Sequence, residues 1–124
     1  RRGSMKAADI KEFGLSLPNS EYEYKMEWDV EVGLIGRKIF MMVSILNDRP
    51  MISLKVKPHD GDDLRLEFPD HIIAGYHMNK RHWITVFHEE GFDDELLRKL
   101  IVDSYELVMK TFPKKVQLTL NPDL

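Results

Sequence analysis

The stretch from His77 to Trp83 holds the densest group of side chains that can bind a ligand or react. Within seven residues it gathers two permanent cations, two imidazoles, a carboxamide and an indole, which belong to Lys80, Arg81, His77, His82, Asn79 and Trp83. In an extended chain, the cations suit phosphates, the carboxamide suits a base edge, and the indole suits base stacking. The stretch therefore favours a single-stranded or grooved nucleic acid as its ligand.

A purely structural interpretation of the same stretch stays open. Asn79 readily adopts a left-handed turn, and Trp83 can belong to the core together with Tyr76. Lys80 and Arg81 would then only solvate the turn. Polar loops and aromatic strand residues are the ordinary expectation for a folded domain, so this interpretation is the base case.

Two further lysines, Lys55 and Lys57, are two positions apart in a predicted strand and so lie on the same face of it. They would extend a basic surface if that strand lies beside the loop. The alternative is that they only keep a sheet face soluble. Carboxylates that would repel phosphate follow soon after the loop, at Glu89, Glu90, Asp93, Asp94 and Glu95. With 18 basic and 21 acidic residues, the chain has a net charge of -3, so any nucleic-acid site must be local.

No catalytic or metal-binding pattern is evident elsewhere. The five histidines, His59, His71, His77, His82 and His88, show no HExxH spacing. The serines lack a nucleophile-elbow context, no Gly-rich phosphate loop is present, and adjacent carboxylates such as Asp62 and Asp63 suit helix capping better than acid–base chemistry. The chain has no cysteine, which excludes disulfides, thiol nucleophiles and thiolate-bound metals. We expect a non-enzymatic binding module without a metal or cofactor.

The elements that must position these residues follow from periodicity. Residues 7–17 carry apolar residues three and four apart, which predicts a short helix. Residues 22–34 are apolar at every even position, which indicates β structure, with a strand from about Val30 preceded by an extended arm or a broken segment. Gly36-Arg37 predicts a two-residue hairpin turn before a strand over 38–45. After a turn at residues 47–50, alternation over 51–57 predicts a half-buried third strand of a meander.

The second half of the chain holds two predicted helices and one strand. Pro58 can open a short helix that ends before Pro69. Residues 70–81 show no period, and residues 82–87 are rich in β-branched and aromatic types, which predicts a strand. A continuous apolar stripe from Leu96 to Phe112 predicts a long helix capped by Asp93. Residues 116–120 suit a last strand or a docked tail.

A meander and a long one-faced helix must bury their apolar faces against each other, so we expect an α+β two-layer sandwich, an antiparallel sheet with helices packed on one face. The length of 124 residues fits one domain over 5–124, with Arg1–Ser4 as an expression-tag remnant. No apolar run is long enough for a membrane span. We expect a cytoplasmic monomer without a membrane partner.

Several segments closely resemble the MmcQ/YjbR family of small bacterial proteins. The resemblance is carried by residues 76–83 (YHMNKRHW), 94–97 (DELL), 103–108 (DSYELV) and 112–115 (FPKK). It implies a frataxin-like α+β sandwich and a DNA-binding label that rests on comparison with a double-wing arrangement. The positions that would bear that label here are Lys55, His77, Asn79, Lys80, Arg81, His82 and Trp83. The sequence departs from the family in a shorter leading helix and at residues 59–63.

The rival function is a protein- or small-ligand-binding adaptor with no nucleic-acid role. In that case the aromatic row Tyr22, Tyr24 and Trp28 would form an exposed apolar patch or the wall of a pocket. Exposure of these three side chains is the observation that separates the two hypotheses.

Overall fold

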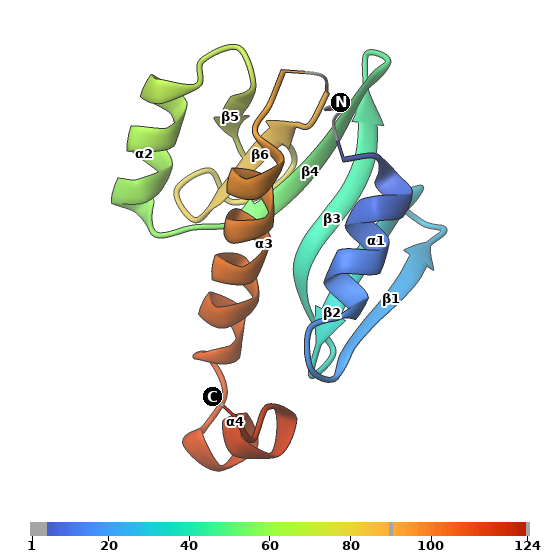
Figure 1. Cartoon of the computed structure of the whole chain (residues 1–124), viewed down its shortest axis with the longest axis vertical. Helices are drawn as coiled ribbons and strands as arrows, with labels where there is room; N and C mark the ends of the chain where they lie inside the picture. Colours follow the sequence, from blue (N-terminus) through green and yellow to red (C-terminus); the bar gives the residue numbers. More distant parts are fainter. Residues whose placement is uncertain (1–4, 90, 124) are drawn as a thin grey trace.

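A computed structural model of the chain describes residues 5–89 and 91–123, so the expected tag remnant Arg1–Ser4 and the acidic Glu90 lie outside the described residues. Within those residues, antiparallel strands form one open sheet in the order β1-β2-β3-β4-β6-β5 (Figure 1). The strands are β1 Ser20–Lys25, β2 Val30–Ile35, β3 Lys38–Leu46, β4 Arg49–Lys55, β5 Ile72–Ala74 and β6 Trp83–Phe87. The helices are α1 Ala7–Leu15, α2 Pro58–Glu67, α3 Asp94–Met109 and α4 Lys114–Leu120.

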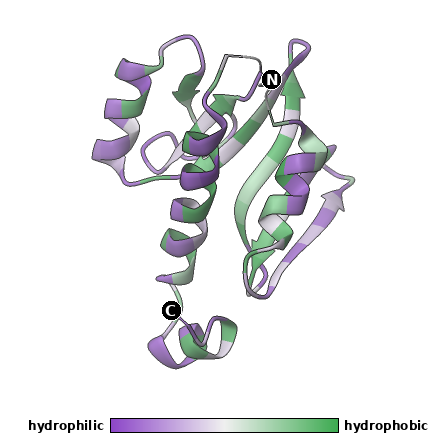
Figure 2. Ribbon diagram, viewed as in Figure 1, coloured by the Kyte–Doolittle hydropathy of each residue, from purple (hydrophilic) through white to green (hydrophobic). Residues whose placement is uncertain are grey.

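The main core lies between the sheet and the helices on one of its faces. Helix α1 packs over β1 and β2, α3 over β2 to β4, and α2 over β5 and β6. Figure 2 shows hydrophobic residues concentrated in the central strands, while α2 is mostly hydrophilic. The predicted α+β sandwich with an antiparallel sheet is therefore confirmed. No helix in the described part of the chain is both long and apolar enough to cross a bilayer.

Helix α3 follows the sequence prediction closely. The side chain of Asp93 accepts hydrogen bonds from the backbone N–H groups of Glu95 and Leu96, at 2.9 and 3.3 Å. The first four N–H groups of a helix have no partner within the helix, and this cap satisfies two of them, which stabilises the first turn. Phe92 and Leu97 are both buried on either side of the cap, as a hydrophobic staple requires.

The hairpin turns are set by left-handed residues. Gly36 and Arg37 have φ angles of 58° and 67°, so both central residues of the predicted turn are left-handed, as a type I′ turn requires. Asn47 and Asp48 form the next turn in the same way, with φ angles of 53° and 66°. The predicted turn over residues 47–50 is thus too long, because β4 already begins at Arg49.

The alternating segment over 22–34 forms two paired strands, so the first half of it is the strand β1 and the meander has four strands. Tyr22 packs against the core and lies opposite Gly33. Paired residues share a face and neighbours alternate, so Val32 faces the opposite side. The even positions therefore do not share one face. Because of the four-residue turn at 26–29, the even-numbered residues of β2 face the side of the sheet opposite to those of β1.

Strand β4 is buried on both faces, so the expectation of a half-buried strand is wrong. Ser53 lies on the face away from the helices but is only 2% exposed, and its hydroxyl is 2.8 Å from that of Thr85. The backbone N–H of Tyr76 donates to the Thr85 hydroxyl at 2.9 Å. The segment after β5 therefore folds over this face and covers the hydroxyl pair.

Two short elements differ from expectation. Strand β5 lies within the aperiodic region 70–81, because three residues at a sheet edge are too few to show a period. Residues 114–120 form helix α4 instead of a strand or tail. Pro113 precedes this helix, and a proline at a helix start loses no hydrogen bond. Seven residues do not distinguish alternation from a single helical face.

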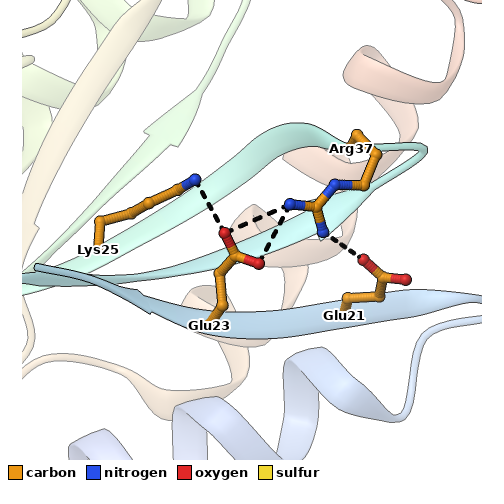
Figure 3. A network of polar contacts seen from close by, with 4 residues as sticks. All are labelled: Glu21, Glu23, Lys25 and Arg37. Atoms are coloured by element: carbon orange, nitrogen blue, oxygen red, sulfur yellow. Dashed lines mark hydrogen bonds and ion pairs between the residues drawn. The ribbon is translucent and has the colours of Figure 1, made fainter.

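Charged side chains cover part of the face away from the helices (Figure 3). Arg37 donates to Glu21 at 2.7 Å and to Glu23 at 3.1 Å, and Lys25 pairs with Glu23 at 2.8 Å. Hydrogen bonds from Lys25 and Arg37 lower the pKa of the Glu23 carboxyl. Glu23 lies opposite the fully buried Val32, so this network covers apolar side chains that the helices do not reach.

Candidate nucleic-acid interface

Residues 75–82 form the loop between the edge strand β5 and strand β6. The loop is closed at its base, because the Gly75 N–H donates to the Trp83 carbonyl at 2.9 Å. Gly75 is buried, and a side chain there would come within 2.7 Å of the Trp83 Cβ. A residue without a side chain is needed for this close approach. The loop is therefore a shaped segment held against β6.

Asn79 shapes the loop through its side-chain oxygen. Its Oδ1 accepts hydrogen bonds from the N–H groups of Arg81 and His82, at 2.9 and 3.1 Å. The left-handed residue of the loop is His77, with φ of 60°, and not Asn79 as the structural interpretation expected. An asparagine side chain that accepts from residues two and three positions later forms an Asx turn in ordinary backbone geometry. Only the Nδ2 group of Asn79 stays available to a base edge.

Lys80 is partly used within the loop. Its ammonium group donates to the Gly75 carbonyl at 2.8 Å, so it bridges the two ends of the loop. His77 and His82 are both exposed, and the His77 ring lies 4.1 Å from the Tyr76 ring. Of the loop residues, Arg81 and the two histidines therefore project to solvent without such a structural bond among the described residues.

The structure places Lys55 and Lys57 beside this loop. Lys55 lies opposite Trp83 in the ladder, and the Val56 N–H extends the ladder with a 2.8 Å bond to the His82 carbonyl. The Lys55 ammonium group lies 5.7 Å from the centre of the Trp83 ring, which is a cation–π contact. Trp83 is half-buried and so belongs neither to the core nor fully to the surface.

The cations near the loop are among the surface cations of the described residues that form no ion pair. Ion pairs within the described residues engage Lys25, Arg37, Arg49, Arg65 and Lys99. In the same part of the chain, Lys55, Lys57 and Arg81 have no carboxylate within ion-pair distance. A cation without a carboxylate partner keeps its full charge for a ligand anion.

Of the acidic cluster expected to repel phosphate, the described residue Glu89 lies at the other end of β6. The loop precedes Trp83 and Glu89 follows Phe87, so the length of the strand, roughly 17 Å, separates them. Glu89 is also neutralised by Arg49, which donates to it from Nε at 3.0 Å. This hydrogen bond lowers the pKa of the Glu89 carboxyl. Glu89 therefore does not counteract the cations at the loop.

The histidines do not gather into a metal site within the described residues, where no three His, Cys, Asp or Glu side chains are placed to hold an ion.

The three residues of the predicted aromatic row differ in their exposure to solvent. Tyr22 is half-buried against the core, while Tyr24 and Trp28 are 56% and 58% exposed. Tyr24 also borders a cavity of about 330 Å³ that includes His88. Sequence reasoning missed this cavity, because its walls come from separate strands and only the alternation around Tyr24 pointed to it.

We expect Asn79 to act through its oxygen. Asn79→Ala removes the acceptor of two loop N–H groups and should lower the free energy of unfolding by about 0.5–1.5 kcal/mol. Asn79→Asp keeps the acceptor, so its stability should stay within about 0.5 kcal/mol of the native protein. Urea unfolding followed by circular dichroism measures both. Equal loss of stability in the two variants would contradict this role.

Two comparisons of sequence bear on the chain as a whole. A family model described as YjbR matches residues 15–107. The uncharacterised protein YbdF of Escherichia coli is 39% identical over 112 residues, which cover 90% of this chain and 91% of that protein. The uncharacterised protein YjbR of Escherichia coli is 25% identical over 111 residues, covering 90% of this chain and 93% of that protein.

Solved structures share the fold. A crystal structure of a Deinococcus radiodurans protein with a DUF419 domain superposes with a TM-score of 0.86 at 32% identity, covering 94% of this chain and 88% of that one. A Pseudomonas syringae protein superposes with a TM-score of 0.70 at 25% identity, covering 83% of this chain and 98% of that one. The names of these proteins state no ligand and no activity.

Proposed function

The chain belongs to the YjbR family, and from its own geometry we propose that it is a non-enzymatic domain that binds single-stranded DNA or RNA through Lys55, Lys57, Arg81 and Trp83. The Escherichia coli relatives are uncharacterised, so the support comes from the residues of this chain. The proposal needs one copy of the chain, and a cysteine-free sequence suits the reducing cytoplasm.

The observation that carries this proposal is the juxtaposition of cations without carboxylate partners and a half-buried indole. The ladder pair of Lys55 with Trp83, and the bond from Val56 to His82, bring residues 55–57 beside residues 81–83. Phosphate contacts supply most of the affinity of a nucleic-acid site, and an aromatic face adds stacking on a base. Single strands suit this arrangement because their bases are free to stack.

The overall charge of the chain restricts the binding to this surface. A net charge of -3 gives no general attraction to polyanions, so the affinity should be modest and local. Three phosphate contacts on a single strand predict that log K falls against log salt with a slope of about -2.

The test is fluorescence anisotropy of a labelled 15-nucleotide oligothymidine across a salt series. We expect saturable binding, and we expect Lys57→Ala/Arg81→Ala to weaken it and to make the salt slope shallower by about 1.4, because two phosphate contacts are lost. The matched control, Lys114→Ala/Lys115→Ala, removes the same charge from helix α4 and should bind like the native protein.

Two results would contradict the proposal. One is the absence of binding by the native protein at low salt. The other is equal weakening by both double variants, which would show that only net charge matters. A duplex of the same length separates the proposed single-strand preference from general affinity for phosphate.

A further inference from the structure

The loop of the proposed nucleic-acid surface begins with a tight turn over residues 75–78. The Met78 N–H donates to the Gly75 carbonyl at 3.3 Å, which closes the turn. His77, at its third position, has φ of 60°, where glycine or asparagine is preferred because a Cβ is unfavourable there. A residue that keeps an unfavourable backbone conformation points to a function of its side chain.

The His77 ring lies against the ring of Tyr76, and the two form an aromatic pair. Their centroids are 4.1 Å apart, and the ring planes are inclined by 50°. Tyr76 is half-buried and His77 is exposed, so the pair is anchored to the protein through Tyr76 and reaches solvent through His77. An aromatic surface of this kind is suited to stacking on a nucleic-acid base.

The aromatic pair lies on the same face of the sheet as Trp83. The Tyr76 N–H donates to the Thr85 hydroxyl at 2.9 Å, and Thr85 is two residues after Trp83 in β6. Residues two apart in a strand share a face, so Trp83 and Thr85 both lie on the face away from the helices. Gly75 lies directly against Trp83, since a Cβ there would be 2.7 Å from the Trp83 Cβ. Because Tyr76 follows Gly75 in the chain, the aromatic pair lies next to Trp83.

Hydrogen bonds within the loop fix this arrangement. The Gly75 carbonyl accepts a second hydrogen bond, from the Lys80 ammonium group at 2.8 Å. The Trp83 N–H donates to the Asn79 carbonyl at 3.0 Å. Residues that are already held in place lose little conformational freedom when a ligand binds, and this favours affinity.

We propose that this surface binds two adjacent bases of a single strand, one stacked on Trp83 and the other on the Tyr76–His77 pair. This inference rests on the proposed function and extends it from one base to two. Bases of a single strand can be splayed apart to reach separate aromatic surfaces, whereas the bases of a duplex stay paired. A stacked ring brings no permanent positive charge, so the second base should add affinity without changing the salt slope.

The first experiment varies the number of bases at constant charge. Three strands of five nucleotides carry two adjacent thymines, one thymine or none, with abasic sites elsewhere, and two-dimensional ¹H–¹⁵N NMR follows their binding to the native protein. The second thymine should lower the Kd at least about fivefold, and the signals of Tyr76, His77 and the Trp83 indole should all shift. If only one aromatic surface binds a base, the second thymine merely doubles the number of ways of binding, and that result would overturn the proposal.

The second experiment replaces the larger ring of the aromatic pair. Tyr76→Leu should raise the Kd of the 15-nucleotide oligothymidine at least about fivefold, because one base loses its stacking partner. The salt slope should stay that of the native protein, because no charge is lost. Tyr24→Leu makes the same change in β1, at the other edge of the sheet, and should bind like the native protein. Unchanged affinity of Tyr76→Leu, or equal weakening by both variants, would contradict the second stacking position.

A third variant, His77→Gly, separates a binding role from a structural one. Glycine tolerates the positive φ, so this variant should unfold at the same or a higher urea concentration while its Kd for the oligothymidine rises. A loss of stability together with affinity would show that the ring only supports the loop.

These results also distinguish failure of this inference from failure of the proposed function. If the native protein does not bind oligothymidine at low salt, both fail. If it binds with the expected salt slope but Tyr76→Leu and His77→Gly bind equally well, only the second stacking position fails. Should Tyr76→Leu not fold, the three short strands on the native protein decide alone.

Discussion

Replacing Ser104 by alanine should lower the free energy of unfolding by about 2–4 kcal/mol, because a buried carbonyl and a partly buried N–H lose their partner. The Ser104 hydroxyl donates to the Phe40 carbonyl at 2.6 Å and accepts from the Lys55 N–H at 2.8 Å. One side chain of helix α3 thus serves both strands β3 and β4.

The position of Ser104 explains the size of this effect. The β3–β4 ladder begins at the pair Met41 and Leu54, so Phe40 and Lys55 would be the next pair. The register between β2 and β3 shifts beside Gly33, and Phe40 and Met41 both lie near Gly14 of helix α1. A bulge of this kind interrupts the ladder and leaves backbone groups unpaired. The hydroxyl fills that gap where water has no access, since Ser104 is fully buried.

Urea unfolding gives the measurement, with an unchanged m-value as the sign that only stability has changed. Ser53→Ala is the matched control, because Ser53 is also buried but bonds to another hydroxyl, that of Thr85. It should cost only about 1 kcal/mol. If the two alanine variants lose the same stability, the Ser104 hydroxyl is not what completes the β3–β4 ladder.

The sequence predicts those elements whose local signals agree with their tertiary contacts. Helix α3 has a periodic stripe, a capping aspartate and a flanking staple, and all three are observed. The Gly36-Arg37 turn is equally local, because a two-residue hairpin is fixed by the conformations of its own residues. Strand β1 is ambiguous in the sequence because Met26 and Trp28 continue its alternation through the turn while being exposed there. Alternation alone does not report a reversal of the chain.

The candidate sites also differ in how much of them the sequence predicts. The loop at residues 77–83 is visible in the sequence because its side chains are contiguous. The position of Lys55 beside the loop is only conditional in the sequence and is given by the pairing of β4 with β6. The sequence does not show which loop side chains stabilise the loop and which remain available to a ligand, because this depends on which backbone groups Asn79 and Lys80 can reach. Only the aromatic row around Tyr24 points to the cavity in the sequence, since the other residues that line it belong to separate strands and His88 looks like an ordinary histidine until its burial is known.

Gly36→Ala is the second substitution with a large expected effect, about 2–5 kcal/mol of stability lost. Two causes add. Gly36 has φ of 58°, where an L-residue with a Cβ costs about 1–2 kcal/mol. A Cβ at this position would also lie 2.5 Å from the Phe112 ring, and such overpacking typically costs about 1–3 kcal/mol. The turn between β2 and β3 is thereby fitted to the segment that follows helix α3.

A double-mutant cycle separates the two causes, because truncating the ring removes the collision and leaves the backbone cost. Phe112→Leu alone should destabilise the protein, since the ring packs on the core and lies 4.4 Å from the Lys38 ammonium. In that background Gly36→Ala should cost only the backbone part, so the two losses should be less than additive by the collision part, about 1–3 kcal/mol. Additive losses would show that the ring moves aside freely and that backbone conformation alone requires the glycine.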